Sequence, residues 1–261
     1  MDLVKALLIS VVHGTLEFFP VSSSTHVLVL ESWLGYRSEA LELVLGCGTA
    51  VSVLLYYRKR VVDLLKGMVA RKLLSWLYVL SLALGCIPIV LAYSFAYKGV
   101  KSYLLDHHWL IGVLMALSGL LVVSTRRASP GTSLVTPRRG ILVGLAQMFA
   151  LLQGVSRSGV TISSGRWLGI NWESAVEFSF LLSVPLSVGG LAMGLDSFES
   201  GLVGTKVVWW HLAICGLLSC GIGYASLSLL HVLVKRGMFW LFGAYCVLAG
   251  IVGSIVCFLK G

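Results

Sequence analysis

Six long apolar runs constrain this chain more than any other feature of its sequence. They cover residues 41–57, 73–97, 109–125, 173–195, 208–234 and 238–259. Each run is long enough to cross a bilayer core that is about 30 Å thick. Charged residues make up only 12% of the chain, against about a quarter in an ordinary soluble domain. The sequence therefore predicts an all-α integral membrane protein with six transmembrane helices.

Two further apolar segments, 3–34 and 140–169, are each broken by a polar, turn-forming cluster. The first break reads PVSSSTH at 20–26, and the second reads QGVSRSGVT at 153–161. Neither half of either segment is long enough to span a bilayer. Non-helical backbone at membrane depth is tolerated only inside protein or around a wet cavity. We therefore expect two re-entrant helix–loop–helix pairs.

Basic residues gather in three clusters between the apolar runs, which are Arg58–Arg60 with Lys66, Arg71 and Lys72; Arg126, Arg127, Arg138 and Arg139; and Lys235 with Arg236. The other side of a six-span chain has only Lys98, Lys101 and Lys206 in its loops. Cytoplasmic loops carry an excess of Lys and Arg, so the clusters are predicted to face the cytoplasm of a cell in whose plasma membrane the protein lies. Short clusters of this kind do not indicate a nucleic-acid partner.

The two breaks belong to an internal repeat. At an offset of 134 residues, 21–39 and 155–173 are identical at seven of nineteen positions, including a shared Trp-Leu-Gly. Three predicted spans separate the copies, so they enter the membrane from opposite faces. This pattern predicts an inverted-topology repeat within one domain (1–261), with halves of about 1–125 and 126–261. The first tip would enter from outside and the second from the cytoplasm.

Together the two tips carry the residues of a phosphate site. The first tip supplies His13, Glu17, Ser22, Ser23, Ser24, Thr25 and His26, and the second supplies Gly154, Ser156, Arg157, Ser158, Gly159 and Thr161. Arginine, hydroxyls and glycine-flanked amides bind phosphate, and a carboxylate with histidines adds acid–base, nucleophilic or metal-binding capacity. A phosphate site inside a membrane indicates a lipid phosphate.

The motifs HGTLEFFPVSSSTH (13–26) and QGVSRSGVT (153–161) resemble those of the undecaprenyl pyrophosphate phosphatase, or bacitracin-resistance, family. The segment WLGINWESAVEFSFLLSVP that begins at Trp167 is also similar to that family. The resemblance implies hydrolysis of a polyprenyl diphosphate to the lipid monophosphate and inorganic phosphate, which recycles a glycan carrier lipid.

The resemblance also implies residue roles, because the essential groups of the family fall on Glu17, Ser22, His26, Ser156, Arg157 and Thr161. Arg157 would clamp the diphosphate, with Ser23, Ser24, Gly154, Ser156, Ser158 and Thr161 as further ligands. Glu17 would orient metal or water, and His26 would act as general base or nucleophile. Ser22 would be a nucleophile or another phosphate ligand, and the sequence leaves open which group attacks phosphorus.

The sequence departs from the family pattern at His13 and Gln153, and the first of these departures bears on the cofactor. His13 stands where the family has an acid or amide, and Gln153 stands where it has proline. The resemblance implies a divalent metal, Mg²⁺ or Ca²⁺, with Glu17 and His13 as candidate ligands. Such ions prefer oxygen ligands, so His13 weakens that site. The alternatives are another metal, metal held mainly by the diphosphate, or altered activity.

The same residues also allow structural or non-catalytic interpretations. The Ser-rich break could serve helix packing, and Arg157 could extend to the cytoplasmic surface. Glu42 and Glu177 are expected to structure helix starts. The same architecture also suits a non-hydrolytic transporter of lipid phosphate or anions. A homodimer is one option for the assembly.

Overall fold

The protein is built from helices across the part of the chain that the structure, a computed structural model, describes: residues 2–202 and 209–260. Six of the helices are long and apolar enough to cross a membrane, which confirms the predicted all-α membrane protein. They are α3 (Glu39–Tyr56), α5 (Leu73–Asp106), α6 (His108–Ser124), α9 (Trp172–Leu202), α10 (Trp209–Lys235) and α11 (Phe239–Lys260).

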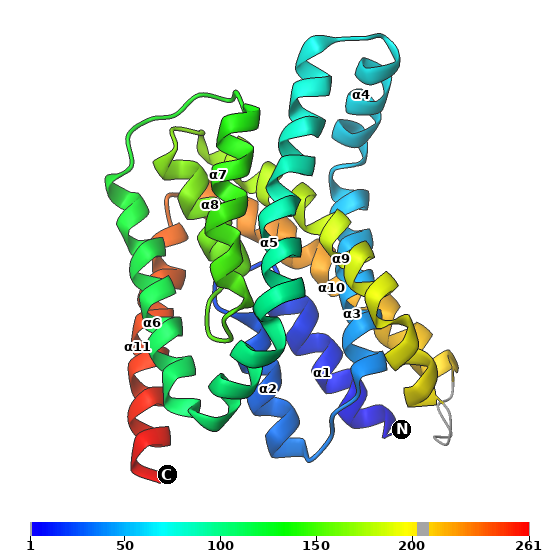
Figure 1. Cartoon of the computed structure of the whole chain (residues 1–261), viewed down its shortest axis with the longest axis vertical. Coiled ribbons are helices and arrows are strands. Elements are labelled where there is room, and N and C mark those ends of the chain that lie inside the picture. The colour runs from blue at the N-terminus through cyan, green and yellow to red at the C-terminus, as the bar shows by residue number, and fades with distance from the viewer. Residues whose placement is uncertain (1, 203–208, 261) are drawn as a thin grey trace.

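The two broken segments form two pairs of short helices. The first pair is α1 (Leu3–Leu16) and α2 (Ser23–Leu34), and the second is α7 (Pro137–Gln147) and α8 (Arg157–Trp167), with the 3₁₀ turn η2 (Met148–Leu151) between them. In Figure 1 the first pair occupies the lower half and the second the upper half, and both breaks lie near the middle. At 1.5 Å per residue, the 14 residues of α1 extend about 21 Å, which is less than a bilayer core.

Matching residues of the repeat occupy matching structural positions. Ser22 and Ser156 are the N-cap residues of α2 and α8. Gly35 and Gly169, of the two Trp-Leu-Gly turns, both have positive φ, at 59° and 77°. The glycine turn therefore occurs twice, whereas the two serines differ, since Ser22 is left-handed and Ser156 is extended.

The two predicted halves are interleaved rather than side by side. Helix α1 packs against α10, while α7 packs against α5; α3 also contacts α10 and α9, and α6 lies along α11. Each short pair is thus held by long helices of the other half. The division into inverted halves at 125/126 stays a prediction, which these reciprocal contacts favour.

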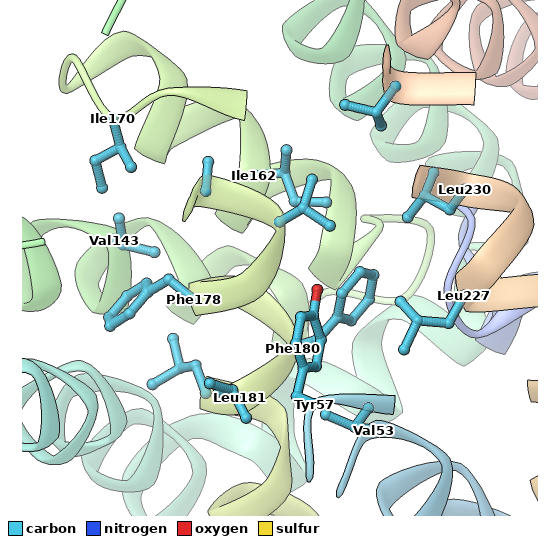
Figure 2. Close-up of a cluster of buried hydrophobic side chains, with 14 of the residues drawn as sticks. Val53, Tyr57, Val143, Ile162, Ile170, Phe178, Phe180, Leu181, Leu227 and Leu230 are labelled. Carbon is cyan, nitrogen blue, oxygen red and sulfur yellow. The ribbon is translucent and has the colours of Figure 1, made fainter. Parts of the chain in front are cut away.

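The main core surrounds α9 and the base of α8. Figure 2 shows aromatic and aliphatic side chains from several helices closing around one another. The labelled residues are Val53 and Tyr57 of α3, Val143 of α7, Ile162 of α8, Ile170, Phe178, Phe180 and Leu181 at or near α9, and Leu227 and Leu230 of α10. All of these are buried, so α8 is anchored in the largest hydrophobic cluster of the described residues.

Helix α5 is longer than the sequence predicted. The apolar run ends near residue 97, and Lys98 and Lys101 were placed in a loop, but the helix continues to Asp106. That placement was wrong because no proline interrupts 98–106, and Leu104 in this extension is buried. The basic clusters at 58–72 and 126–139 both lie at the upper end of the molecule in Figure 1, as expected if they face the same side of the membrane. Lys206 lies outside the described residues.

Helices α6 and α11 cross at paired glycines, and this contact supplies a test of the packing. A Cβ at Gly119 would lie 2.6 Å from the carbonyl oxygen of Gly243. We expect Gly119→Leu to lower the melting temperature in detergent, because overpacking costs about 1–3 kcal/mol.

The matched control is Gly253→Ala on α11, where an added Cβ would meet nothing within 4 Å. It should leave the melting temperature unchanged or raise it slightly. Equal melting temperatures for wild type and Gly119→Leu would contradict the close crossing.

Candidate active site

An ion pair joins the two breaks. Arg157, at the first turn of α8, donates from Nη2 to Oε1 of Glu17 across 2.6 Å. The two side chains are 29% and 18% exposed. Because 140 residues separate them in the chain, this contact shows that the two polar tips meet, as the repeat predicted.

A cavity of about 170 Å³ lies at this meeting point, and we call it the inner chamber. It is lined by Glu17, Phe19, Ser22, Ser23, Ser24, Ala150, Val155, Ser156, Arg157 and Ser158. Seven of the ten are residues that the sequence singled out. The remaining predicted residues, which do not line it, are His13, Thr25, His26, Gly154, Gly159 and Thr161.

The Glu17 carboxylate lies close to side chains from three helices: Arg157 of α8, Ser23 of α2 and His13 of α1. Besides Arg157, its carboxylate accepts a hydrogen bond from Ser23 Oγ to Oε2 at 2.7 Å. His13 lies one turn earlier on α1, with Nε2 3.9 Å from Oε2, as the spacing of four residues predicted. The Nδ1 atom of His13 is buried and has no hydrogen-bond partner. Of Ser22, Ser23 and Ser24, Ser23 is therefore the serine whose hydroxyl is hydrogen-bonded to the Glu17 carboxylate.

Ser22 turns the chain between the break and α2. It has φ 60° and ψ 72°, a left-handed conformation that costs a non-glycine residue about 1–2 kcal/mol. Its side chain is bonded to Thr25 Oγ1 at 2.8 Å, and only 2% of the residue is exposed. The turn points the N-terminus of α2 toward the inner chamber.

His26 is held on both of its ring nitrogens. Nδ1 lies 2.9 Å from the carbonyl oxygen of Ser22, and Nε2 lies 2.7 Å from the hydroxyl of Tyr245 on α11. A carbonyl oxygen only accepts, so Nδ1 must carry a hydrogen. In the neutral ring Nε2 then accepts from the Tyr245 hydroxyl. Tyr245 could not be found from the sequence, because an aromatic residue in an apolar span is ordinary.

The second break supplies a helix N-terminus. Ser156 caps α8 by accepting from the Gly159 amide at 3.1 Å, and Ser158 Oγ donates to the carbonyl oxygen of Phe19 at 3.3 Å. The first N–H groups of a helix lack partners within it, and its dipole favours an anion there. With α2 starting at Ser23, two helix N-termini border one small chamber beside Arg157.

Gly154 and Thr161 shape α8 rather than line the chamber. Gly154 has φ 105°, and a Cβ there would collide with the carbonyl oxygen of Ile111. Thr161 donates to the carbonyl oxygen of Arg157 at 2.8 Å and is 2.5 Å from Ser179 Oγ of α9. Both residues fix the position of the turn that carries Arg157.

A second cavity of about 420 Å³, which we call the outer chamber, adjoins the first. The two share Glu17, Ser23, Ser24 and Ala150 as lining residues. His13 and Gln153 line the outer chamber, so both departures from the family pattern lie there. The sequence missed its other polar residues, which are Glu31, Arg37, Glu42, Tyr93 and Tyr97. The α5 extension forms part of this wall through Leu104.

The residues present do not fit a resident Mg²⁺ or Ca²⁺ ion. Among the described residues, no group of three or more His, Cys, Asp and Glu side chains could hold a metal. The candidate pair of ligands is His13 and Glu17, and Glu17 already accepts from Arg157 and Ser23. Ca²⁺ takes about six to eight oxygen ligands, and Mg²⁺ held by so few side chains completes its shell with water and substrate phosphates, so the protein alone does not retain either ion.

Comparison with known proteins identifies the family of this chain. A family model described as bacitracin resistance protein BacA matches residues 6–252. The chain belongs to this family. Its relatives include proteins named undecaprenyl-diphosphatase from Sorangium cellulosum (36% identical, covering 75% of this chain and 66% of that one), Anaeromyxobacter dehalogenans (33%, covering 96% and 90%) and Chlorobium phaeovibrioides (30%, covering 96% and 95%).

The bond between His26 and Tyr245 in this BacA-family protein is open to a direct test. In ¹⁵N NMR spectra of histidine-labelled protein, we expect His26 to be the tautomer that carries hydrogen on Nδ1. Tyr245→Phe removes the donor to Nε2 and should shift the Nε2 resonance. His26→Asn assigns the signal among the six histidines. An Nε2–H tautomer in the wild type, or a resonance unmoved in Tyr245→Phe, would contradict the bond.

Proposed function

We propose that this protein hydrolyses a polyprenyl diphosphate of the undecaprenyl class to the lipid monophosphate and inorganic phosphate, recycling a glycan carrier lipid. The observation that carries the proposal is the inner chamber, where Arg157 and two helix N-termini border a carboxylate–hydroxyl pair. The names of the relatives support it.

The diphosphate would lie in the inner chamber against the N-terminus of α8. A guanidinium has five N–H donors, so Arg157 can bind phosphate oxygens while it keeps a bond to Glu17. The hydroxyls of Ser24, Ser156 and Ser158 border the same space and are further ligands. This arrangement positions and neutralises the anion, which is most of what phosphoryl transfer requires.

The geometry favours Ser23 as the hydroxyl that attacks the terminal phosphorus. Its proton would pass to Glu17, which is already 2.7 Å away. The P–O bond of the anhydride then breaks, the lipid monophosphate leaves, and water hydrolyses the phosphoserine to release phosphate. Ser22 is less suited to attack, since its hydroxyl is bonded to Thr25. His26, held by the carbonyl of Ser22 and by Tyr245, would position this turn rather than act as the base.

We further infer that α1–α2 and α7–α8 are re-entrant pairs that enter from the outer and the cytoplasmic face of the plasma membrane. The basic clusters at one end support this orientation under the positive-inside rule. The outer chamber, which is bordered by Arg37 and Glu42 after α2, would then open toward the outer face. An inverted repeat accounts for both directions of entry.

Arg157 gives the first test. Arg157→Ala should lower kcat/KM for phosphate release from farnesyl diphosphate in detergent by about a hundredfold or more, the cost typical of losing one preorganised charge-stabilising donor. Arg157→Lys should restore part of the loss, because it keeps the charge without the planar fork.

Arg127→Ala, at an exposed position near the end of α6, is the matched control and should act as the wild type does. A wild-type rate in Arg157→Ala would contradict the assignment. Folded wild-type protein that releases no phosphate, with or without divalent metal, would favour the transporter alternative.

His13 gives a test of metal binding that does not depend on turnover. We expect calorimetry to detect no Mg²⁺ binding to the wild type at millimolar concentration in the absence of diphosphate. His13→Glu adds an oxygen ligand beside Glu17 and should create measurable binding, whereas the neutral His13→Gln should not. Micromolar Mg²⁺ binding by the wild type would show that the described ligand set is incomplete.

A further inference from the structure

A third cavity lies between α5 and the turn that follows α7. It has a volume of about 450 Å³ and is lined only by apolar and aromatic side chains, and we call it the apolar groove. Its α5 wall includes Ala92, Tyr97 and Val100, and its opposite wall includes Leu145, Phe149 and Leu151. Phe149 is 62% exposed and Leu145 is 46% exposed, so the groove opens on the outer surface of the helix bundle.

The apolar groove continues from the outer chamber. Tyr97 and Leu151 line both cavities, and they come from opposite walls, α5 and η2. The two cavities therefore adjoin at these side chains, which flank their boundary from both walls. The outer chamber in turn shares Glu17, Ser23 and Ala150 with the inner chamber. Three cavities therefore follow one another, from charged and hydroxyl-lined to wholly apolar.

We propose that the apolar groove binds the isoprenoid tail of the substrate, with Tyr97 and Leu151 at the threshold between headgroup and tail. This rests on the proposed hydrolysis of a lipid diphosphate. An amphipathic molecule whose diphosphate lies beside Arg157 needs an apolar path from that point into lipid, because water contact with its tail is unfavourable. The groove supplies such a path laterally, between two helices.

A larger groove of about 890 Å³ between α2, α6 and α11 is the alternative path. It borders His26, but it shares with the outer chamber only Leu28, a residue of the helix that separates the two. It shares no lining residue with the inner chamber. Helix α2 is therefore a wall on this side, and the larger groove serves as the control surface.

Two alanines form a matched pair for the test. Ala92 lines the apolar groove and Ala249 lines the larger groove, and both are partly buried on long helices. Each is changed to Trp, and kcat/KM is measured for dimethylallyl, farnesyl and undecaprenyl diphosphate. We expect Ala92→Trp to lower kcat/KM for the long substrates by about tenfold or more, the effect typical of a filled apolar pocket. Its value for dimethylallyl diphosphate should stay within about twofold of wild type.

Ala249→Trp should keep the wild-type ratio of long-substrate to short-substrate kcat/KM, even where overpacking against the cluster around Met115 lowers all three values. Selective loss of the long substrates in Ala249→Trp, or unchanged values in both variants, would overturn the proposal. Retained hydrolysis of the short substrate shows that the variant is folded and that the chemistry is intact. Absence of hydrolysis of every substrate by the wild type would instead refute the proposed function.

A second measurement uses the unmodified protein. A farnesyl diphosphate analogue with a diazirine in its tail is photolysed in the detergent-solubilised wild type, and the labelled peptides are identified. Labelling on α5 and η2 supports the proposal, including in the case where Ala92→Trp loses activity on all substrates. Labelling confined to α2, α6 and α11 would overturn it.

Discussion

The bond between Glu17 and Arg157 is the interaction on which the rest of this architecture depends. A charged side chain at membrane depth is costly unless it is paired or faces a wet cavity. Each of these charges lies in a helix break and is partly buried, and each finds its partner only because the two breaks meet. The interleaved packing of α1 against α10 and α7 against α5 brings about that meeting. The ion pair therefore couples the two broken segments to each other, and the long helices hold them in place.

The same breaks create the binding capacity of the site. Interrupting a helix exposes backbone N–H groups that must find partners, and in lipid these could not be left open. Ser156 satisfies one of them at α8, while α2 begins after the left-handed Ser22 with no side-chain cap. Donors that remain at two adjacent N-termini suit an anion of high charge. What would be a defect in a spanning helix is thus the basis of a phosphate site.

Hydropathy and short motifs in the sequence were enough to predict part of the fold and of the candidate site. The six spans, both breaks and most of the inner chamber followed from local signals: apolar run length, turn residues and the repeated Val-Ser…Trp-Leu-Gly pattern. Tyr245 and Tyr97 could not be found in this way, because both lie in apolar helices whose lipid-facing and protein-facing sides look alike in sequence. The end of α5 was also missed, since the run loses hydropathy before the helix ends. Such features depend on tertiary contacts between distant segments.

Glu17 also helps to separate catalysis from transport. A carboxylate beside a phosphate site repels the ligand, so anion binding by itself does not account for it. The ion pair with Arg157 offsets that repulsion but also occupies part of the guanidinium that should hold phosphate. A proton acceptor next to a hydroxyl is what an attacking serine needs, and Ser23 already donates to this carboxylate. The placement of Glu17 against the Ser23 hydroxyl therefore favours hydrolysis.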